Sequence, residues 1–223
     1  MTTFKNQMNT VIFIIISTLL LCACGKSETA APPPATPKEA AECILASIKK
    51  LDLETLNQYS DNYVETYHNW LGVPTENEYR VFNELLQPRS KRSKRYQSAY
   101  KLDQKIMENL TWEITDVQTD KDTAALDMVI TNINMAKVLE IYENQLIENM
   151  LESPGLGLAQ FAADMAELAA GKDTLISIID DMTNDWDNGG LVSIRVTVSA
   201  YQDNGQWKIH LSQDFINAFS GNM

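Results

Sequence analysis

The sequence predicts an α+β domain in which helices cover one face of an antiparallel sheet, and two patterns of hydrophobic residues support this fold class. Over residues 37–109 and 135–187, apolar residues recur every three or four positions, which is the period of amphipathic helices. Over residues 112–130 and 192–211 they alternate with polar residues, and a short polar turn divides each stretch into a β-hairpin. Two hairpins make a four-stranded, largely antiparallel sheet whose apolar face the helices bury.

The composition is that of an ordinary globular chain, because 44% of the 223 residues are hydrophobic and 22% are charged. The formal net charge of −12 argues against a nucleic-acid partner, since a general nucleic-acid binder presents a basic surface to phosphate. Two His and three Cys are too few for a zinc ribbon or a disulfide framework. We therefore expect neither a metal nor another cofactor.

The first 23 residues have the features of an export signal. Lys5 precedes an apolar run of thirteen residues from Val11 to Ala23. As a helix, such a run is about 20 Å long, which is shorter than the ~30 Å hydrocarbon core of a bilayer. A signal peptide over residues 1–23 fits this length better than a permanent transmembrane helix.

The end of the run reads Leu-Cys-Ala-Cys-Gly over residues 21–25 and resembles the cleavage box of bacterial lipoproteins. The resemblance implies that Cys24 accepts a diacylglyceryl group on its thiol and becomes the N-terminus of the mature chain. Residues 24–36, with three consecutive prolines, then form an extended linker. We expect a protein anchored by lipid to the cell membrane on its extracytoplasmic side. The alternatives are an uncleaved apolar anchor and a signal cut elsewhere.

Residues 37–223 are expected to form a single domain that begins with a helix. Thr36 is a capping residue, Pro37 occupies the first helical position, and Glu39 stands three residues after the cap. Cys43 lies within the apolar pattern of this helix. We expect a buried, inert thiol there rather than a reactive one.

Three further helices are expected before the first hairpin. Asp52 caps one that continues to residue 70, because its apolar and aromatic residues recur at helical spacing: Leu53, Leu56, Tyr59, Tyr63, Tyr67 and Trp70. Thr75 and Glu78 start another helix, which buries Tyr79, Phe82, Leu85 and Leu86. A third is expected over residues 93–109.

The two hairpins have recognisable turns. The first turns at residues 120–122, and Val117 is out of phase with Ile114, which predicts a bulge near Asp116. The second turns at Asp203-Asn204-Gly205, a sequence typical of a tight hairpin turn. Between the hairpins, residues 135–187 form three one-sided apolar stripes, which we interpret as a three-helix insertion.

Four segments carry a family resemblance: DTAAL at 122–126, ITN at 130–132, NGQWKI at 204–209 and DFINAFSG at 214–221. With the order of elements, they resemble lipoproteins of clostridia-like Gram-positive bacteria whose domain of unknown function belongs to the nuclear transport factor 2-like superfamily. The resemblance spans roughly residues 38–134 and 190–221. It implies a cone, in which a curved sheet wraps around a long N-terminal helix and leaves a cavity at the wide end. The insertion either closes this cavity as a lid or extends the core. Some superfamily enzymes abstract protons with an Asp and a Tyr in the cavity, but no catalytic residue of this chain matches.

Aromatic residues form one candidate binding surface. Tyr63, Tyr67 and Trp70 share a face of the expected second helix, and such rings stack on sugars or other rings. They are our candidate ligand-binding residues, for a small apolar or aromatic ligand. The alternative is that the aromatic stripe packs into the core.

A second candidate is a basic cluster in an otherwise acidic chain. Five of the seven residues at 89–95 are cationic: Arg89, Lys91, Arg92, Lys94 and Arg95. Such a cluster suits anionic lipid headgroups or an anionic envelope polymer. The alternative is a solvated loop leading into a helix, although cations are unfavourable near a helix N-terminus.

Other patterns assign no catalytic and no metal-binding residue. The acidic stretch at 180–190 resembles a calcium loop, but a loop starting at Asp185 has Val196 where the bidentate Glu belongs. His68 and His210 have no partner nearby in the sequence. The nucleophile elbow, the phosphate loop and the dinucleotide fingerprint are absent from the sequence.

We interpret the chain as a membrane-tethered, non-enzymatic lipoprotein that binds a ligand or acts as an envelope interaction module. One alternative is a structural or assembly protein that dimerises or docks through its sheet face, which a filled interior and a flat, exposed apolar sheet would favour. The other is a proton-shuttling enzyme, which a buried acid beside a tyrosine in a cavity would favour.

Overall fold

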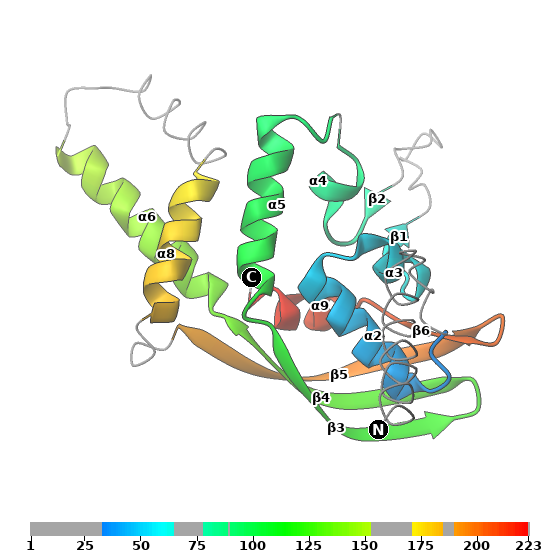
Figure 1. Ribbon diagram of the computed structural model, residues 1–223. Coiled ribbons are helices and arrows are strands. Elements are labelled where there is room, and N and C mark those ends of the chain that lie inside the picture. Colours follow the sequence, from blue (N-terminus) through cyan, green and yellow to red (C-terminus); the bar gives the residue numbers. More distant parts are fainter. Residues whose placement is uncertain (1–32, 65–77, 89, 153–170, 185–189, 223) are drawn as a thin grey trace, which may run out of the picture. The chain divides into compact units, whose positions relative to one another are not determined.

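The computed structural model describes residues 33–64, 78–88, 90–152, 171–184 and 190–222. Residues Pro34–Met223 form one compact unit. Its elements are α2 (Pro37–Lys50), α3 (Leu53–Gln58), β1 (Tyr63–Val64), β2 (Glu78–Tyr79), α4 (Asn83–Leu86), α5 (Lys94–Met107), β3 (Thr111–Asp120), β4 (Thr123–Ile133), α6 (Met135–Glu152), α8 (Lys172–Asn184), β5 (Leu191–Asp203), β6 (Gln206–Ile209) and α9 (Gln213–Phe219) (Figure 1).

The main sheet has four antiparallel strands in the order β3-β4-β5-β6, which confirms the predicted α+β class. Both predicted hairpin turns are present, and Asn204 and Gly205 adopt the positive φ angles of 52° and 78° that a tight turn requires. The predicted bulge is also confirmed, because the pairing of β3 with β4 shifts between Ile114 and Asp116.

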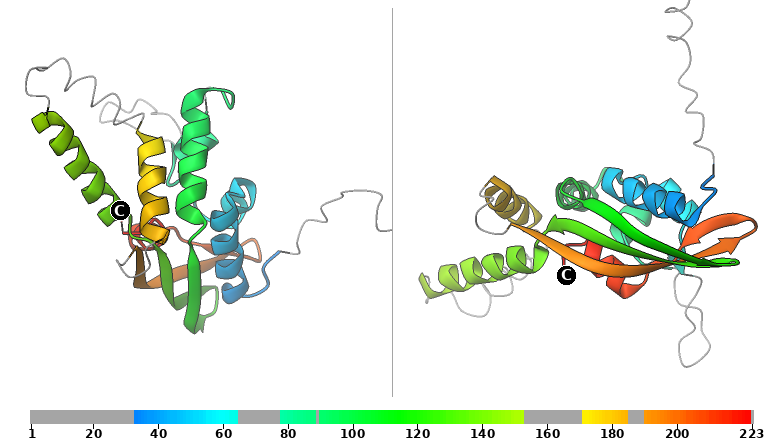
Figure 2. Two further views of the ribbon diagram at one scale, coloured as in Figure 1. Left: turned by 60° about the vertical axis from the view of Figure 1, so that its left-hand side comes forward. Right: turned by 90° about the horizontal axis from the view of Figure 1, so that it is seen from below.

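Only one face of this sheet is covered by described residues. The residues of β4 and β5 that point to the covered face are buried: Ala124, Leu126, Met128, Ile130, Asn132, Val198 and Ala200. Helices α2, α5 and α9 pack on that face (Figures 1 and 2). The alternate residues of β5 are exposed: Ser193, Arg195, Thr197 and Ser199. The two faces therefore follow the two-residue period of the sequence.

Helix α2 begins as predicted. The Thr36 side chain accepts a hydrogen bond from the Glu39 backbone N–H, and proline occupies the first turn. Ile44 and Ile48 are fully buried, and burial of such a side chain contributes roughly 1.5–3 kcal/mol. Burial, reinforced by the Asp52 carboxylate, raises the pKa of the Cys43 thiol, which disfavours the reactive thiolate.

The prediction of a helix from Asp52 to residue 70 is wrong. Asp52 does cap α3, but the helix ends at Gln58 and Tyr63 lies in strand β1. The Ser60 hydroxyl donates to the Leu56 carbonyl, a local bond that competes with helix continuation. The chain then runs beside β6, where the Ile209 N–H donates to the Tyr59 carbonyl. A tertiary strand contact therefore overrides the helical spacing of the aromatic residues.

The helix expected from Thr75 and Glu78 is also wrong in its bounds. Residues Glu78–Tyr79 form β2, which pairs antiparallel with β1, and only Asn83–Leu86 are helical. Phe82, just before α4, has a φ of 57°. This left-handed conformation interrupts any helix that would join residue 78 to residue 86.

The helical regions around the two hairpins agree better with the sequence. Ser93 caps α5, and α6 and α8 occupy the expected insertion. Helix α8 packs against both α5 and α6, and Lys105 of α5 forms an ion pair with Asp180 of α8. The middle stripe of the insertion, expected at residues 158–168, lies outside the described residues.

Helix α9 was not predicted as an element, and it completes the core. Phe215 and Phe219 are fully buried, with their rings in edge-to-face contact. The buried Asn132 side chain of β4 donates to the Phe219 carbonyl at 2.6 Å. Two residues after Phe219, the Gly221 carbonyl accepts a hydrogen bond from the Met135 N–H at 2.8 Å. The end of the chain is thus held at the junction between β4 and α6.

A candidate ligand pocket beside Asp103

A pocket of about 390 Å³ lies where α5 meets the segment around α4, the start of α8 and the end of α9. Figure 1 shows α5 between α4 and α8. The apolar residues that line it are Val81, Phe82, Ala99, Ile106, Met107 and Phe219. The polar ones are Arg80, Asn83, Glu84, Asp103, Lys172 and Ser220. The pocket thus combines apolar walls with a small set of charged groups.

Asp103 is placed in this pocket by the apolar stripe of α5. It stands four residues after Ala99 and three before Ile106, so all three share one side of the helix. Ala99 and Ile106 are buried, and Asp103 is half-buried. Desolvation raises the pKa of Asp103 to about 6, and nearby Lys172 and Glu84 modify it with opposite signs. Within the described part of the chain, no hydrogen bond or ion pair reaches this carboxylate.

The two cations at the pocket are held by other acids. Lys172 Nζ lies 2.7 Å from Glu84 Oε2, and Arg95 Nη2 lies 2.8 Å from Glu84 Oε1. The hydrogen bond from Lys172, followed by that from Arg95, lowers the pKa of Glu84. Arg80 lies 3.5 Å from the Asp61 carboxylate and donates to the Asp61 carbonyl at 3.0 Å. Neither cation is directly paired with Asp103.

Phe82 contributes an unusual backbone to the pocket wall. Its φ of 57° is rare for a bulky residue, and such strain costs on the order of 1–3 kcal/mol. The N–H groups of Leu85 and Leu86 donate to the Phe82 carbonyl at 3.0 and 2.9 Å, so α4 holds the strained residue in place. Strained residues of this kind are often found where a protein positions a ligand.

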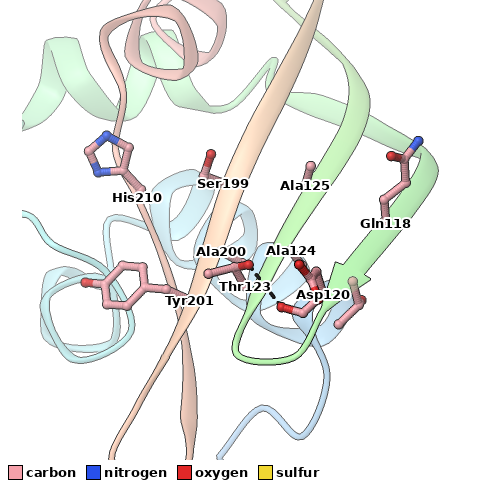
Figure 3. Close-up of a pocket in the computed structure, with 10 residues that line it drawn as sticks. Gln118, Asp120, Thr123, Ala124, Ala125, Ser199, Ala200, Tyr201 and His210 are labelled. Carbon is pink, nitrogen blue, oxygen red and sulfur yellow. Dashed lines mark hydrogen bonds between the residues drawn. The ribbon is translucent and has the colours of Figure 1, made fainter.

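A second hollow, of about 690 Å³, lies on the open face of the sheet (Figure 3). The strand register aligns Gln118, Ala125 and Ser199 in one row, and the His210 N–H donates to the Ser199 carbonyl. The small side chains of Ala125 and Ser199 form the floor, and the longer side chains of Gln118, His210 and Tyr201 stand around it. The residues that line it come from β3, β4, β5 and the end of β6, with none from a helix.

His210 has a tertiary partner that its sequence neighbours do not reveal. Its Nδ1 lies 2.6 Å from Asp61 Oδ2, while Asp61 Oδ1 accepts from the Leu211 N–H at 2.8 Å. In the described residues, no hydrogen bond joins the Ser199 hydroxyl to the His210 ring. The arrangement therefore ties the segment after α3 to the end of β6 and does not form a nucleophile–base pair.

Of the candidate aromatic residues, the described part includes Tyr63, which does not line the pocket. Tyr63 lies in β1 with 43% of its surface exposed, and its ring contacts Tyr79 at a centroid distance of 5.4 Å. Tyr67 and Trp70 lie outside the described residues, as does the lipidation candidate Cys24. The prediction that Tyr63 lies on the second helix is wrong, because α3 ends at Gln58 and Tyr63 lies in β1.

The structure describes four cations of the basic cluster, one of which forms an ion pair with an acid. Lys91, Arg92 and Lys94 are exposed at the start of α5, whereas Arg95 pairs with Glu84. Arg89 lies outside the described residues. The Ser93 side chain caps α5, because its hydroxyl oxygen accepts a hydrogen bond from the Tyr96 backbone N–H in the first turn of the helix.

The described residues contain no group of three or more His, Cys, Asp or Glu side chains that could hold a metal ion. Of the acidic stretch at 180–190, residues 185–189 lie outside the described part. None of the helices in that part is both long enough and apolar enough to cross a bilayer.

Comparison with known proteins gives no relative that identifies this arrangement: no protein family model, no curated protein and no solved structure matches the chain. The pocket therefore has to be interpreted from its own chemistry.

Sequence reasoning missed Asp103, although a signal for it exists. Within α5, an acid stands in line with Ala99, Ile106 and Met107, which are buried. An acidic residue on the apolar side of an amphipathic helix indicates either a buried partner or a cavity. The sequence cannot show which, because the groups opposite α5 come from α4, α8 and α9.

Proposed function

We propose that this chain is an extracytoplasmic lipoprotein, anchored to the cell membrane through Cys24, whose domain binds a small ligand with an apolar body in the pocket beside Asp103. The observation that carries the proposal is the pocket itself. Its volume of about 390 Å³ falls within the range of small-molecule sites, and its described lining combines six apolar with six polar residues, four of which are charged. The anchor is supported by the apolar run and the cleavage box at residues 11–25.

The proposal extends to the finer fold, a nuclear transport factor 2-like cone. It is supported by a four-stranded antiparallel sheet packed on the N-terminal helix α2 and by a hollow among the helices on that side. In this arrangement α8 of the insertion supplies Lys172 to the pocket, which fits a partial lid better than added core.

The alternatives receive less support. The exposed residues of β5 on the open sheet face are polar, whereas docking through a flat sheet is favoured by an apolar face. A proton-shuttling enzyme needs a donor beside the acid, and the described lining of the Asp103 pocket includes no tyrosine or histidine. Ligand binding without chemistry therefore fits these residues best.

Native mass spectrometry tests this function directly. The mature protein is extracted from its own host in a mild detergent, and its native mass is compared with that of the denatured chain. We expect an excess of a few hundred daltons on the native protein. The Ala99→Phe variant fills the pocket, so it should lose this excess, whereas Ala125→Phe on the open face should retain it. A native protein with no excess mass in the wild type contradicts an occupied pocket.

The basic cluster supports a second contact, with anionic lipid headgroups or an anionic envelope polymer. Lys91, Arg92 and Lys94 are exposed, and each cation near an anionic surface contributes about 1 kcal/mol. Replacing all three by Gln should weaken binding to phosphatidylglycerol liposomes at low salt by roughly fivefold per charge. The control replaces three exposed lysines elsewhere: Lys38, Lys50 and Lys121. Equal losses of liposome binding in the two variants would mean that the cluster is a solvated loop with no specific role in binding.

A further inference from the structure

Among the described residues that line the Asp103 pocket there are two cations and two acids, but only three of these four groups are directly paired. Lys172 and Arg80 are the cations that line it, and they lie 2.7 Å from Glu84 and 3.5 Å from Asp61, respectively. Glu84 is bound on both oxygens, by Lys172 and by Arg95. Among the described lining residues, this leaves Asp103 as the charged side chain without a direct partner.

An ionised carboxylate can only accept hydrogen bonds, so Asp103 needs a donor. The apolar neighbours Ala99, Ile106 and Met107 supply none from their side chains. A half-buried carboxylate without a donor is unfavourable, and a ligand that supplies one recovers that free energy on binding. The strongest such donor is a cationic N–H group, because hydrogen bonds between charged groups are about twice as strong as neutral ones.

We propose that the pocket beside Asp103 binds a small organic amine, whose ammonium group donates to the Asp103 carboxylate while its apolar body lies against the wall formed by Ala99, Ile106 and Met107. This inference rests on the proposed function and names the ligand class for the same site. An organic anion fits less well. Its charge would face Asp103 and Glu84, and the cations Lys172 and Arg80 are already paired.

The raised pKa of Asp103 is consistent with this ligand class. At about 6, it leaves the carboxylate ionised at neutral pH, when an alkylamine is fully protonated. The charged groups that face Asp103 are Lys172 from α8 and Glu84 from α4. Amine binding should therefore weaken as the pH falls below about 6, because the carboxylate then takes up a proton.

The experiment uses three probes of similar size: phenethylamine, 2-phenylethanol and 3-phenylpropionate. Binding to the mature protein in nonionic detergent is measured by equilibrium dialysis against a detergent blank. We expect phenethylamine to bind at least about tenfold more tightly than 2-phenylethanol, which is the contribution typical of a charge-assisted hydrogen bond. 3-Phenylpropionate should bind most weakly.

Two variants and one control make the result specific. Asp103→Asn should remove the preference for the amine and leave 2-phenylethanol binding unchanged. Glu84→Gln frees Lys172 to pair with Asp103, so it should weaken amine binding in the wild-type background and have no such effect when combined with Asp103→Asn. The control, Asp173→Asn, removes an exposed acid next to Lys172 that does not line the pocket, and it should change nothing.

The outcomes separate the ligand class from the proposed function. Equal affinities for amine and alcohol, or an unchanged amine affinity in Asp103→Asn, overturn the amine proposal and leave a ligand pocket. If none of the three probes binds and the native protein carries no excess mass, both proposals fail. If Asp103→Asn does not fold, the Glu84→Gln variant decides, since undiminished amine affinity in it also contradicts the proposal.

Discussion

The pocket beside Asp103 and the open-face hollow lie on opposite sides of the same sheet and differ in what encloses them. The pocket beside Asp103 is bordered by residues from α5, α8, α9 and the segment around α4, and its apolar walls belong in part to the core. The hollow in Figure 3 lies on the open face, where strand pairing alone positions Ala125 and Ser199. Burial raises the pKa of an acid in the first hollow and that of the Tyr201 phenol in the second.

This difference shows why the larger hollow is not the better candidate. The open-face hollow has a volume of about 690 Å³ against about 390 Å³, yet its floor consists of the small side chains of Ala125 and Ser199 on the open face of the sheet. A ligand there would stay in contact with water. In the Asp103 pocket, helices place buried apolar side chains beside a partly buried acid, and partial desolvation strengthens the interactions of that acid. The following substitutions test this contrast, from the largest expected effect to the smallest.

The largest effect on stability is expected when a side chain that forms a wall of the Asp103 pocket is truncated. Phe219 is 1% exposed and forms part of both the core and the Asp103 pocket. Phe219→Ala should lower the free energy of unfolding by about 3–5 kcal/mol, because it leaves a cavity in a packed core. Tyr201→Ala in the open-face hollow should cost much less, about 1 kcal/mol. Urea unfolding followed by circular dichroism measures both, and similar losses would mean that the two hollows are equally built into the core.

The next effect concerns two glycines with nearly equal backbone angles. Gly221 (φ 79°) follows α9 near the pocket, and Gly205 (φ 78°) lies in the β5–β6 turn. A Cβ at Gly221 would lie 1.9 Å from the Ile133 carbonyl oxygen, whereas a Cβ at Gly205 meets nothing within 4 Å. Gly221→Ala should therefore cost roughly 3 kcal/mol and Gly205→Ala about 1 kcal/mol. Thermal unfolding should rank them in this order, and the reverse order would contradict the packing of the C-terminal residues against β4.

A smaller effect, of opposite sign, is expected at Asp103. Its folded pKa of about 6 lies above the ordinary value, so the native state binds more protons than the unfolded state between pH 4 and 6. Through this group, wild-type stability is fully present below about pH 4 and falls as the pH rises toward 6. Asp103→Asn should thus stabilise the ligand-free domain by ~1–2 kcal/mol at pH 7.5, a value reduced for partial exposure.

The same variant should have no stabilising effect at pH 4, where the wild-type carboxyl is protonated. Urea unfolding at the two pH values provides the measurement, and the Asp173→Asn variant serves as the exposed control. A variant that is destabilised equally at both pH values would indicate that Asp103 accepts a structural hydrogen bond.

The smallest effect is expected on the open face. Ser199→Ala replaces an exposed hydroxyl that forms no side-chain hydrogen bond among the described residues. Its free energy of unfolding should stay within about 0.5 kcal/mol of wild type. Binding of phenethylamine should also stay unchanged. A loss of binding in this variant would move the ligand to the hollow of Figure 3.

The sequence was sufficient wherever an element follows from local chemistry. Thr36 and Asp52 cap helices as expected, because a capping bond joins residues only two or three positions apart. The hairpins and the bulge before Asp116 follow from the two-residue period and its single change of phase. These features need no information about distant parts of the chain.

The tertiary structure decided the features that depend on partners far away in sequence. Tyr63 has the spacing of a helix but lies in a strand, because the backbone of Tyr59 pairs with Ile209 some 150 residues later. In the sequence, Asp103 is only an acid on an apolar stripe. The fold brings Lys172 and Glu84 close to its carboxylate, but these two side chains pair with each other. Its missing partner is a property of how α4, α5, α8 and α9 pack. The sequence alone therefore determined the capped helices and the hairpins, whereas long-range packing decided β1, β2 and α9 and created the pocket with its acid that pairs with no described residue.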